Sequence, residues 1–106
     1  MRVLFDQGTP APLRQGLPLH TVETAHERGW ATLRNGDLLQ AAENAGFDLM
    51  ITTDQKLRYQ QNLAERHIAI IVLSTTSWPR IRAVTDAVAS AVARCATERF
   101  IEISIP

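Results

Sequence analysis

The chain has 106 residues, 45% of them hydrophobic, and its 11 Lys plus Arg residues balance 11 Asp plus Glu residues. The length predicts a single domain, residues 1–106, since domains typically run to about 100–150 residues. The hydrophobic content excludes a disordered chain, the zero net charge excludes a global field that attracts nucleic acid, and the single cysteine, Cys95, excludes an internal disulfide.

The chain begins with a strand and a short helical segment. Residues 3–5 are an apolar run closed by turn-forming residues, which is typical of a buried strand. Residues 11–15 allow one or two turns of helix before Gly16 and Pro18 interrupt it. Residues 20–24 alternate weakly between apolar and polar, which predicts a second strand.

A helix and another buried strand come next. Apolar residues recur at helical spacing over residues 36–45, with Asn35 as the expected cap and Gly46 as the expected stop. Residues 49–51 then form an apolar run that ends in two threonines and Asp54. We expect this run to be a strand buried on both faces.

The C-terminal half predicts two helices and two strands. Residues 59–66 indicate a polar helix, and residues 68–73 indicate the most apolar strand of the chain. Ser77 is the expected start of a long helix that runs to about residue 96. Residues 100–105 alternate between apolar and polar, which predicts an edge strand with one face in water.

Strands that alternate with helices predict an α/β domain with a mainly parallel sheet of about five strands, covered by helices on both faces. In such folds, ligands bind outside the carboxyl ends of the strands. Asp6 and Asp54 follow two expected strands, and Asp37 lies in the first turn of the helix that leads into the second of them. These three aspartates are the candidate functional site.

Each of the three aspartates also has a purely structural explanation. Asp6 and Asp54 can start turns, because an Asp side chain bonds to nearby backbone N–H groups. Asp37 can offset the helix dipole, a contribution of about 0.3–1 kcal/mol. Together, however, carboxylates on one rim repel one another unless a cation lies among them. Mg²⁺ is usually held by one or two carboxylates with water and phosphate, so the set predicts a divalent-metal site.

The sequence resembles the PIN-like superfamily, and within it small bacterial PIN-like proteins related to VapC-type toxin ribonucleases. The similarity lies in residues 3–6, residues 35–39 and residues 49–54, and it extends over nearly the whole chain. It implies a three-layer PIN-like fold. It also implies that Asp6, Asp37 and Asp54 hold Mg²⁺ or Mn²⁺ and hydrolyse RNA phosphodiesters, with the protein acting as the toxin of a toxin–antitoxin pair.

Two departures from the family pattern bear on activity. The family's strand ending usually carries a second acid two residues after the first, and here Lys56 stands in that place. A further glutamate often comes from a mid-chain helix, and Glu23 is a loose counterpart on an expected strand. Lys56 can bind a phosphate as a point charge or neutralise an aspartate. The alternative is therefore a catalytically inactive PIN-like binding or interaction module.

A phosphotransfer receiver is a more distant alternative. It would need a pair of acids after the first strand, and Gln7 occupies the second of those positions.

The residues that follow Asp54 are the predicted substrate contacts. Lys56, Arg58 and Tyr59 belong to a polar segment that is either a solvated helix face or a groove for RNA, where phosphates meet Arg58 and a base stacks on Tyr59. Trp30 and Trp78 are expected to be core or interface anchors. Residues 74–77 follow the most apolar strand, so we expect them at the same rim as the aspartates.

Zinc and membrane partners are not expected. The three histidines are far apart in sequence and lack companion cysteines. No apolar run approaches the ~20 residues that cross a bilayer, and Asp6 comes too early for a secretory signal, so we expect a cytoplasmic protein. The apolar edge strand over residues 100–105 predicts a protein partner, either an antitoxin encoded nearby or a second copy in a homodimer.

Overall fold

A parallel sheet lies at the centre of the computed structural model, which describes residues 1–60 and 62–106 without the side chains of Arg58, Gln60 and Ala64. Across the sheet the described strands are β2 (Thr21–Thr24), β1 (Arg2–Phe5), β3 (Leu49–Thr52), β4 (Ala69–Leu73) and β5 (Phe100–Ile103). Every neighbouring pair in this order is parallel. The expected α/β class with a parallel five-stranded sheet is confirmed.

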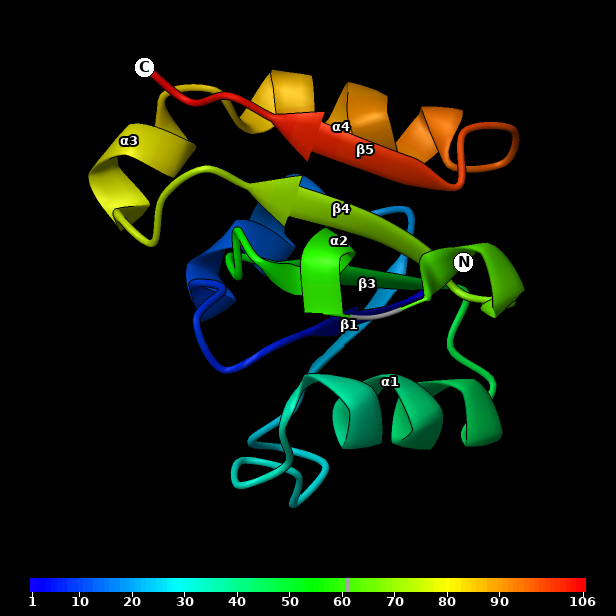
Figure 1. The fold of residues 1–106 in the computed structure, drawn as a ribbon. Helices are drawn as coiled ribbons and strands as arrows, with labels where there is room; N and C mark the ends of the chain where they lie inside the picture. Colours follow the sequence, from blue (N-terminus) through cyan, green and yellow to red (C-terminus); the bar gives the residue numbers. More distant parts are fainter. Residues whose placement is uncertain (61) are drawn as a thin grey trace.

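Helices cover both faces of the sheet, which gives three layers (Figure 1). One face carries η1 (Ala11–Gly16), α3 (Trp78–Arg82) and α4 (Thr85–Arg94). The other face carries α1 (Asn35–Asn44), α2 (Leu57–Gln60) and the short η2 (Leu63–Glu65). In Figure 1, α4 lies alongside β5 at the top and α1 lies at the bottom, with the strands between them.

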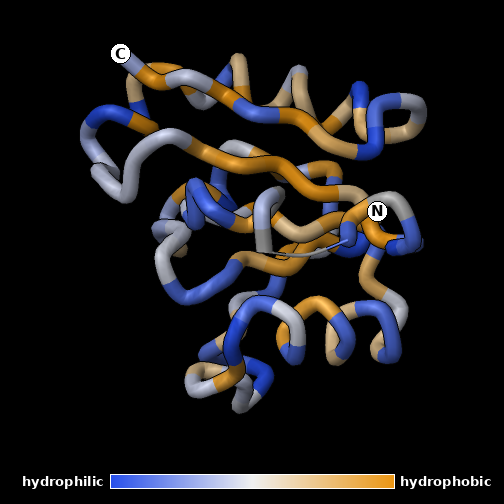
Figure 2. Tube along the Cα trace, viewed as in Figure 1, coloured by the Kyte–Doolittle hydropathy of each residue, from blue (hydrophilic) through white to orange (hydrophobic). Residues whose placement is uncertain are grey.

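Successive residues of each buried strand enter two different cores. Val3 and Phe5 pack in the core on the η1 face, whereas Leu4 between them packs against α1. Side chains alternate in this way because a strand points consecutive residues to opposite faces. The continuous apolar runs follow from this, since both faces need apolar side chains, and Figure 2 shows the apolar residues gathered along the strands.

The predicted helix over residues 78–96 is wrong in its length, because it is broken into α3 and α4. Between them Val84 leaves helical geometry, with φ −125° and ψ 28°. The hydroxyl of Thr85 donates to the carbonyl of Arg82 at 3.0 Å, and such a local bond competes with the helical backbone pattern. The break also lets η1 pack closely, since a Cβ on Gly16 would collide with the Thr85 methyl group.

Two other helical expectations need correction. The polar helix expected over residues 59–66 is replaced by α2 and η2, because the buried Leu57 anchors α2 earlier in the chain. Asn35 is the first residue of α1 rather than its cap, and its side chain reaches Asp54 instead. The stop at Gly46 is confirmed by its φ of +83°. No helix in the described part of the chain is long and apolar enough to cross a membrane.

The central strands should dominate stability. Ile71 on β4 is fully buried between β3 and β5, so we expect Ile71→Ala to lower the free energy of unfolding by about 2–5 kcal/mol. Denaturant unfolding measures the change. Thr21→Ala, at an exposed position of β2, is the control and should change it by about 0.5 kcal/mol or less. An equal fall in the free energy of unfolding of the two variants would contradict the burial of β4.

Candidate functional site at the carboxyl edge of the sheet

The order of the strands reverses between β1 and β3. After β1 the chain moves outward to β2 through η1 on one face, and after β3 it moves the other way to β4 through α2 on the opposite face. The two connections therefore diverge at the carboxyl ends of neighbouring strands. In open α/β sheets this divergence opens the crevice in which ligands bind. Asp6 and Asp54 stand at the two sides of it.

Asp6 is the more buried of these two aspartates, with 8% of its surface exposed. Its Oδ1 accepts hydrogen bonds from the backbone N–H of Thr9 at 3.0 Å and from the Thr9 hydroxyl at 2.7 Å. Its Oδ2 accepts a short hydrogen bond from the Thr52 hydroxyl. The carboxylate thus closes the turn after β1, as the structural explanation expects, and is held in one orientation by β3.

Thr52 connects Asp6 to Asp54. While its hydroxyl donates to Asp6, its Oγ1 accepts the backbone N–H of Asp54 at 3.0 Å. Asp54 in turn accepts the Lys56 backbone N–H at 2.9 Å and the side-chain amide of Asn35. These contacts run without interruption from β1 through β3 to the start of α1. Asp6 and Asp54, which the sequence predicts at one rim, are therefore connected through Thr52 by hydrogen bonds.

Asp37 has a different environment. It lies exposed in the first turn of α1, two residues after Asn35. Within residues 1–60 and 62–106, no group of three or more Asp, Glu, His or Cys side chains is arranged to hold a metal ion. The structure therefore connects Asp6 with Asp54 but does not bring Asp37 into one ligand set with them, and the three-aspartate metal site stays a prediction.

The donor chemistry of the connected pair does fit a hard cation. A carboxylate can accept about four hydrogen bonds, and among the described residues Asp6 receives three and Asp54 receives two. Each carboxylate keeps acceptor capacity. Two carboxylates with water are a usual protein contribution to a Mg²⁺ site.

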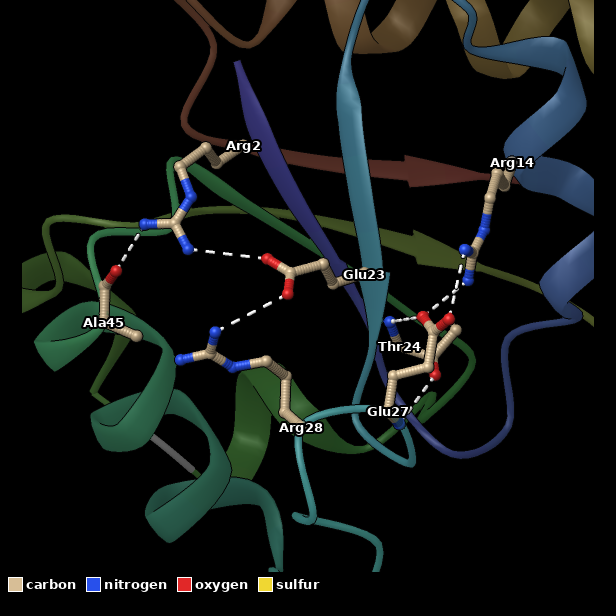
Figure 3. Close-up of polar contacts among 7 residues, drawn as sticks. All are labelled: Arg2, Arg14, Glu23, Thr24, Glu27, Arg28 and Ala45. Atoms are coloured by element: carbon tan, nitrogen blue, oxygen red, sulfur yellow. Dashed lines mark hydrogen bonds and ion pairs between the residues drawn. The ribbon is translucent and has the colours of Figure 1, made fainter.

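Glu23 does not join this site. Its carboxylate lies between the guanidinium groups of Arg2 and Arg28, each at 3.5 Å (Figure 3). The same arginines lie over aromatic rings, Arg2 over Phe47 at 4.5 Å and Arg28 over Trp30 at 4.8 Å. Arg2 also donates to the carbonyl of Ala45 at the end of α1. Glu23 therefore ties β2 to β1 and α1.

The predicted substrate contacts lie just beyond Asp54. Lys56 is exposed, and its backbone N–H, rather than its ammonium group, bonds Asp54. Tyr59 is 81% exposed on α2. The side chain of Arg58 lies outside the described part of the structure, so its predicted role stays a prediction.

A cavity of about 570 Å³ opens beside Asp6 on the η1 face. It is lined by the segments that end or follow β1, β2 and β4, by η1 and by the first residue of α3, and its lining side chains include Asp6, Arg14, His26, Glu27, Thr76 and Trp78. Thr76 belongs to the segment that was expected at the rim. Arg14, Glu27 and His26 were missed as site residues, because no motif or spacing in the sequence relates η1 to the turn after β2.

Arg14 and Glu27 both line this cavity and form a two-bond ion pair (Figure 3). The guanidinium nitrogens lie 2.6 and 3.2 Å from the two carboxylate oxygens. Glu27 also accepts the backbone N–H of Thr24 at 2.9 Å. Hydrogen bonding by Arg14, and then by the Thr24 backbone, lowers the pKa of Glu27 from 4.5 to about 2. Glu27 is therefore a carboxylate at neutral pH, oriented by Arg14.

Comparison with protein-family models, with curated proteins and with solved structures found no match for this chain.

The Thr52 hydroxyl should be important for stability. Thr52→Val keeps the shape of the side chain but leaves Asp6 Oδ2 without this donor in a site where Thr52 is 1% exposed. We expect the free energy of unfolding to fall by about 1–3 kcal/mol in denaturant titrations. Thr76→Val, at an exposed position, should change it by about 0.5 kcal/mol or less. A Thr52→Val protein as stable as the wild type would show that Asp6 does not need the bond.

The ion pair predicts a specific titration. In carboxyl-detected NMR, Glu27 should titrate near pH 2 in the wild type and at a higher pH, towards 4.5, in Arg14→Gln. Because folding lowers this pKa, the pair stabilises the fold above pH 4.5, and this contribution is lost as the pH falls from 4.5 to about 2. The stability difference between wild type and Arg14→Gln should narrow over the same range. An unchanged Glu27 titration in Arg14→Gln would contradict the pairing.

Proposed function

We propose that the chain is a PIN-like domain that hydrolyses RNA phosphodiesters with Mg²⁺ or Mn²⁺, acting in the cytoplasm as the toxin of a toxin–antitoxin pair. The observation that carries the proposal is the hydrogen-bonded connection of Asp6, Thr52 and Asp54 at the point where the strand order reverses. Two oriented carboxylates there supply the oxygen ligands that such a cation prefers.

The residues of the site would have separate roles in binding the cation, orienting the carboxylates and attracting the RNA. Asp6 and Asp54 would hold the cation, which when bound supplies charge neutralisation and an activated water. Thr9 and Thr52 fix the orientation of the Asp6 carboxylate, and Asn35 fixes that of Asp54. Lys56 is exposed next to Asp54 and would attract a phosphate of the RNA as a point charge. Asp37 would act from outside the connected pair, through water.

A second candidate function is a PIN-like module that binds RNA or protein without catalysis. The internal hydrogen bonds of Asp6 favour it, because both carboxylate oxygens already accept donors from threonines. Lys56 favours it as well, since its ammonium group can neutralise Asp54 and so weaken affinity for a cation.

Cleavage of RNA is the direct test of the first function. Purified protein should cleave structured RNA with Mg²⁺ or Mn²⁺, and Asp6→Asn should lower the rate by at least about 100-fold, because Asp6 would hold the cation. Asp48→Asn is a matched control, because Asp48 precedes β3 at the opposite edge of the sheet and accepts the Arg2 backbone N–H at 2.7 Å. Absence of cleavage, or equal rates in wild type and Asp6→Asn, would refute catalysis at this site.

Thermal stability separates the two candidate functions without an RNA substrate. A ligand that binds only the folded protein adds about 2.7 kcal/mol at 100 times its Kd. If the first function holds, Mn²⁺ should raise the unfolding temperature of the wild type and of Asp48→Asn, but not that of Asp6→Asn. If Mn²⁺ has no effect on any of the three proteins, the non-catalytic module is the better description.

A further inference from the structure

The cavity beside Asp6 is a second place where the rim can hold part of a ligand. Its volume of about 570 Å³ lies within the range of small-molecule sites, about 300–1,000 Å³. Asp6 forms part of its wall, so a group seated in the cavity lies directly next to the proposed reacting site. Asp54 and Asn35 are not among its lining residues, so the cavity reaches the Asp6 side of the acidic pair only.

The walls of the cavity combine an apolar surface with polar groups. Trp78 is partly buried against the core of the η1 face, and it lines the cavity together with Pro10 and Ala11. His26 and Thr76 line the cavity as well, and both are exposed. Hydrogen-bond donors and acceptors thus line the same cavity as the Trp78 indole, which is the composition of a site for a polar, flat ligand.

The charges of the cavity disfavour an anion. The one guanidinium group in the described lining, that of Arg14, is already held by both oxygens of Glu27. Asp6 and Glu27 are acids, and the hydrogen bonds from Arg14 lower the pKa of Glu27 further below neutral pH. A phosphate would meet these carboxylates without a free cation, whereas an uncharged heteroaromatic ring can use Glu27 as an acceptor and Arg14 as a donor.

We propose that this cavity binds one unpaired nucleobase of single-stranded RNA, stacked on Trp78 and hydrogen-bonded by the Arg14–Glu27 pair. Proteins read single-stranded RNA by stacking splayed bases on aromatic side chains and by hydrogen bonds to the base edges. The RNA assignment rests on the proposed function. The base would enter the cavity while its ribose and phosphate stay outside, in solvent, away from the carboxylates of the lining.

The two tryptophans allow an internally controlled experiment. Trp78 lines the cavity, whereas Trp30 packs on Phe47 in the opposite core, with ring centroids 6.1 Å apart. In ¹⁵N-labelled protein, the two indole N–H signals are assigned with Trp30→Phe and Trp78→Phe. Each of the four ribonucleoside 5′-monophosphates is then titrated without metal, with ribose 5-phosphate as the baseless control.

At least one nucleotide should shift the Trp78 signal while the Trp30 signal stays in place, and ribose 5-phosphate should shift neither. Trp78→Leu, which removes the ring, should weaken binding about 5- to 100-fold as monitored by the ¹⁵N signals of residues 24–27. If Trp78→Leu does not fold, Arg14→Gln replaces it and should also weaken binding. Shifts of both indoles, no shift with any nucleotide, or equal shifts with ribose 5-phosphate would overturn the proposal.

A short single-stranded oligoribonucleotide is titrated into the wild-type protein without metal, as the mononucleotides are, and decides between RNA and a free nucleotide. Shifts of Trp78 at a lower concentration than the mononucleotides need would support RNA, and the reverse order would overturn it. The result is independent of cleavage. Nucleotide binding without RNA hydrolysis would support the cavity proposal and refute the nuclease. RNA hydrolysis without a Trp78 shift would support the nuclease and refute the cavity proposal.

Discussion

The parallel pairing of β1 with β3 is the constraint on which the candidate site depends. Because the two strands run in the same direction, Asp6 and Thr52 leave the sheet at the same edge. An antiparallel partner would have placed them at opposite ends. The strand order also reverses at this pair, so the connection after β1 leads towards β2 and the connection after β3 leads towards β4. Because the two connections turn away from each other, neither covers the edge where Asp6 and Thr52 lie. The hydrogen bond from Thr52 to Asp6 is possible only within this arrangement.

Most of the sheet follows from the sequence because its signals are local. A strand buried on both faces must be apolar throughout, so residues 3–5, 49–51 and 68–73 are recognisable without any knowledge of their neighbours. The break between α3 and α4 is harder to foresee. The local bond at the break comes from one threonine hydroxyl, and the apolar spacing continues across the break.

The site was less predictable from the sequence than the sheet, because its contacts join segments that are far apart in the chain. Asp6 and Asp54 were recognisable because both follow strong strand signals, but their connection through Thr52 depends on the pairing of strands far apart in sequence. Asn35 was expected to cap its own helix, whereas its amide serves Asp54. Arg14 and Glu27 carry no sequence signal of their own, since a salt bridge across 13 positions reflects only the folded geometry.

The separation of the two cores by the sheet has a consequence for how the protein can change. The cavity with Trp78 belongs to the η1 face, while the Asn35 contact to Asp54 belongs to the α1 face. Apolar substitutions in the two cores are separated by the sheet, so their effects should combine almost additively, whereas substitutions within the hydrogen-bonded chain from Asp6 to Asn35 should couple. Selection could therefore remodel ligand preference on one side while the acidic pair is supported from the other. A thin layer of parallel backbone gives this small domain two surfaces that can evolve separately.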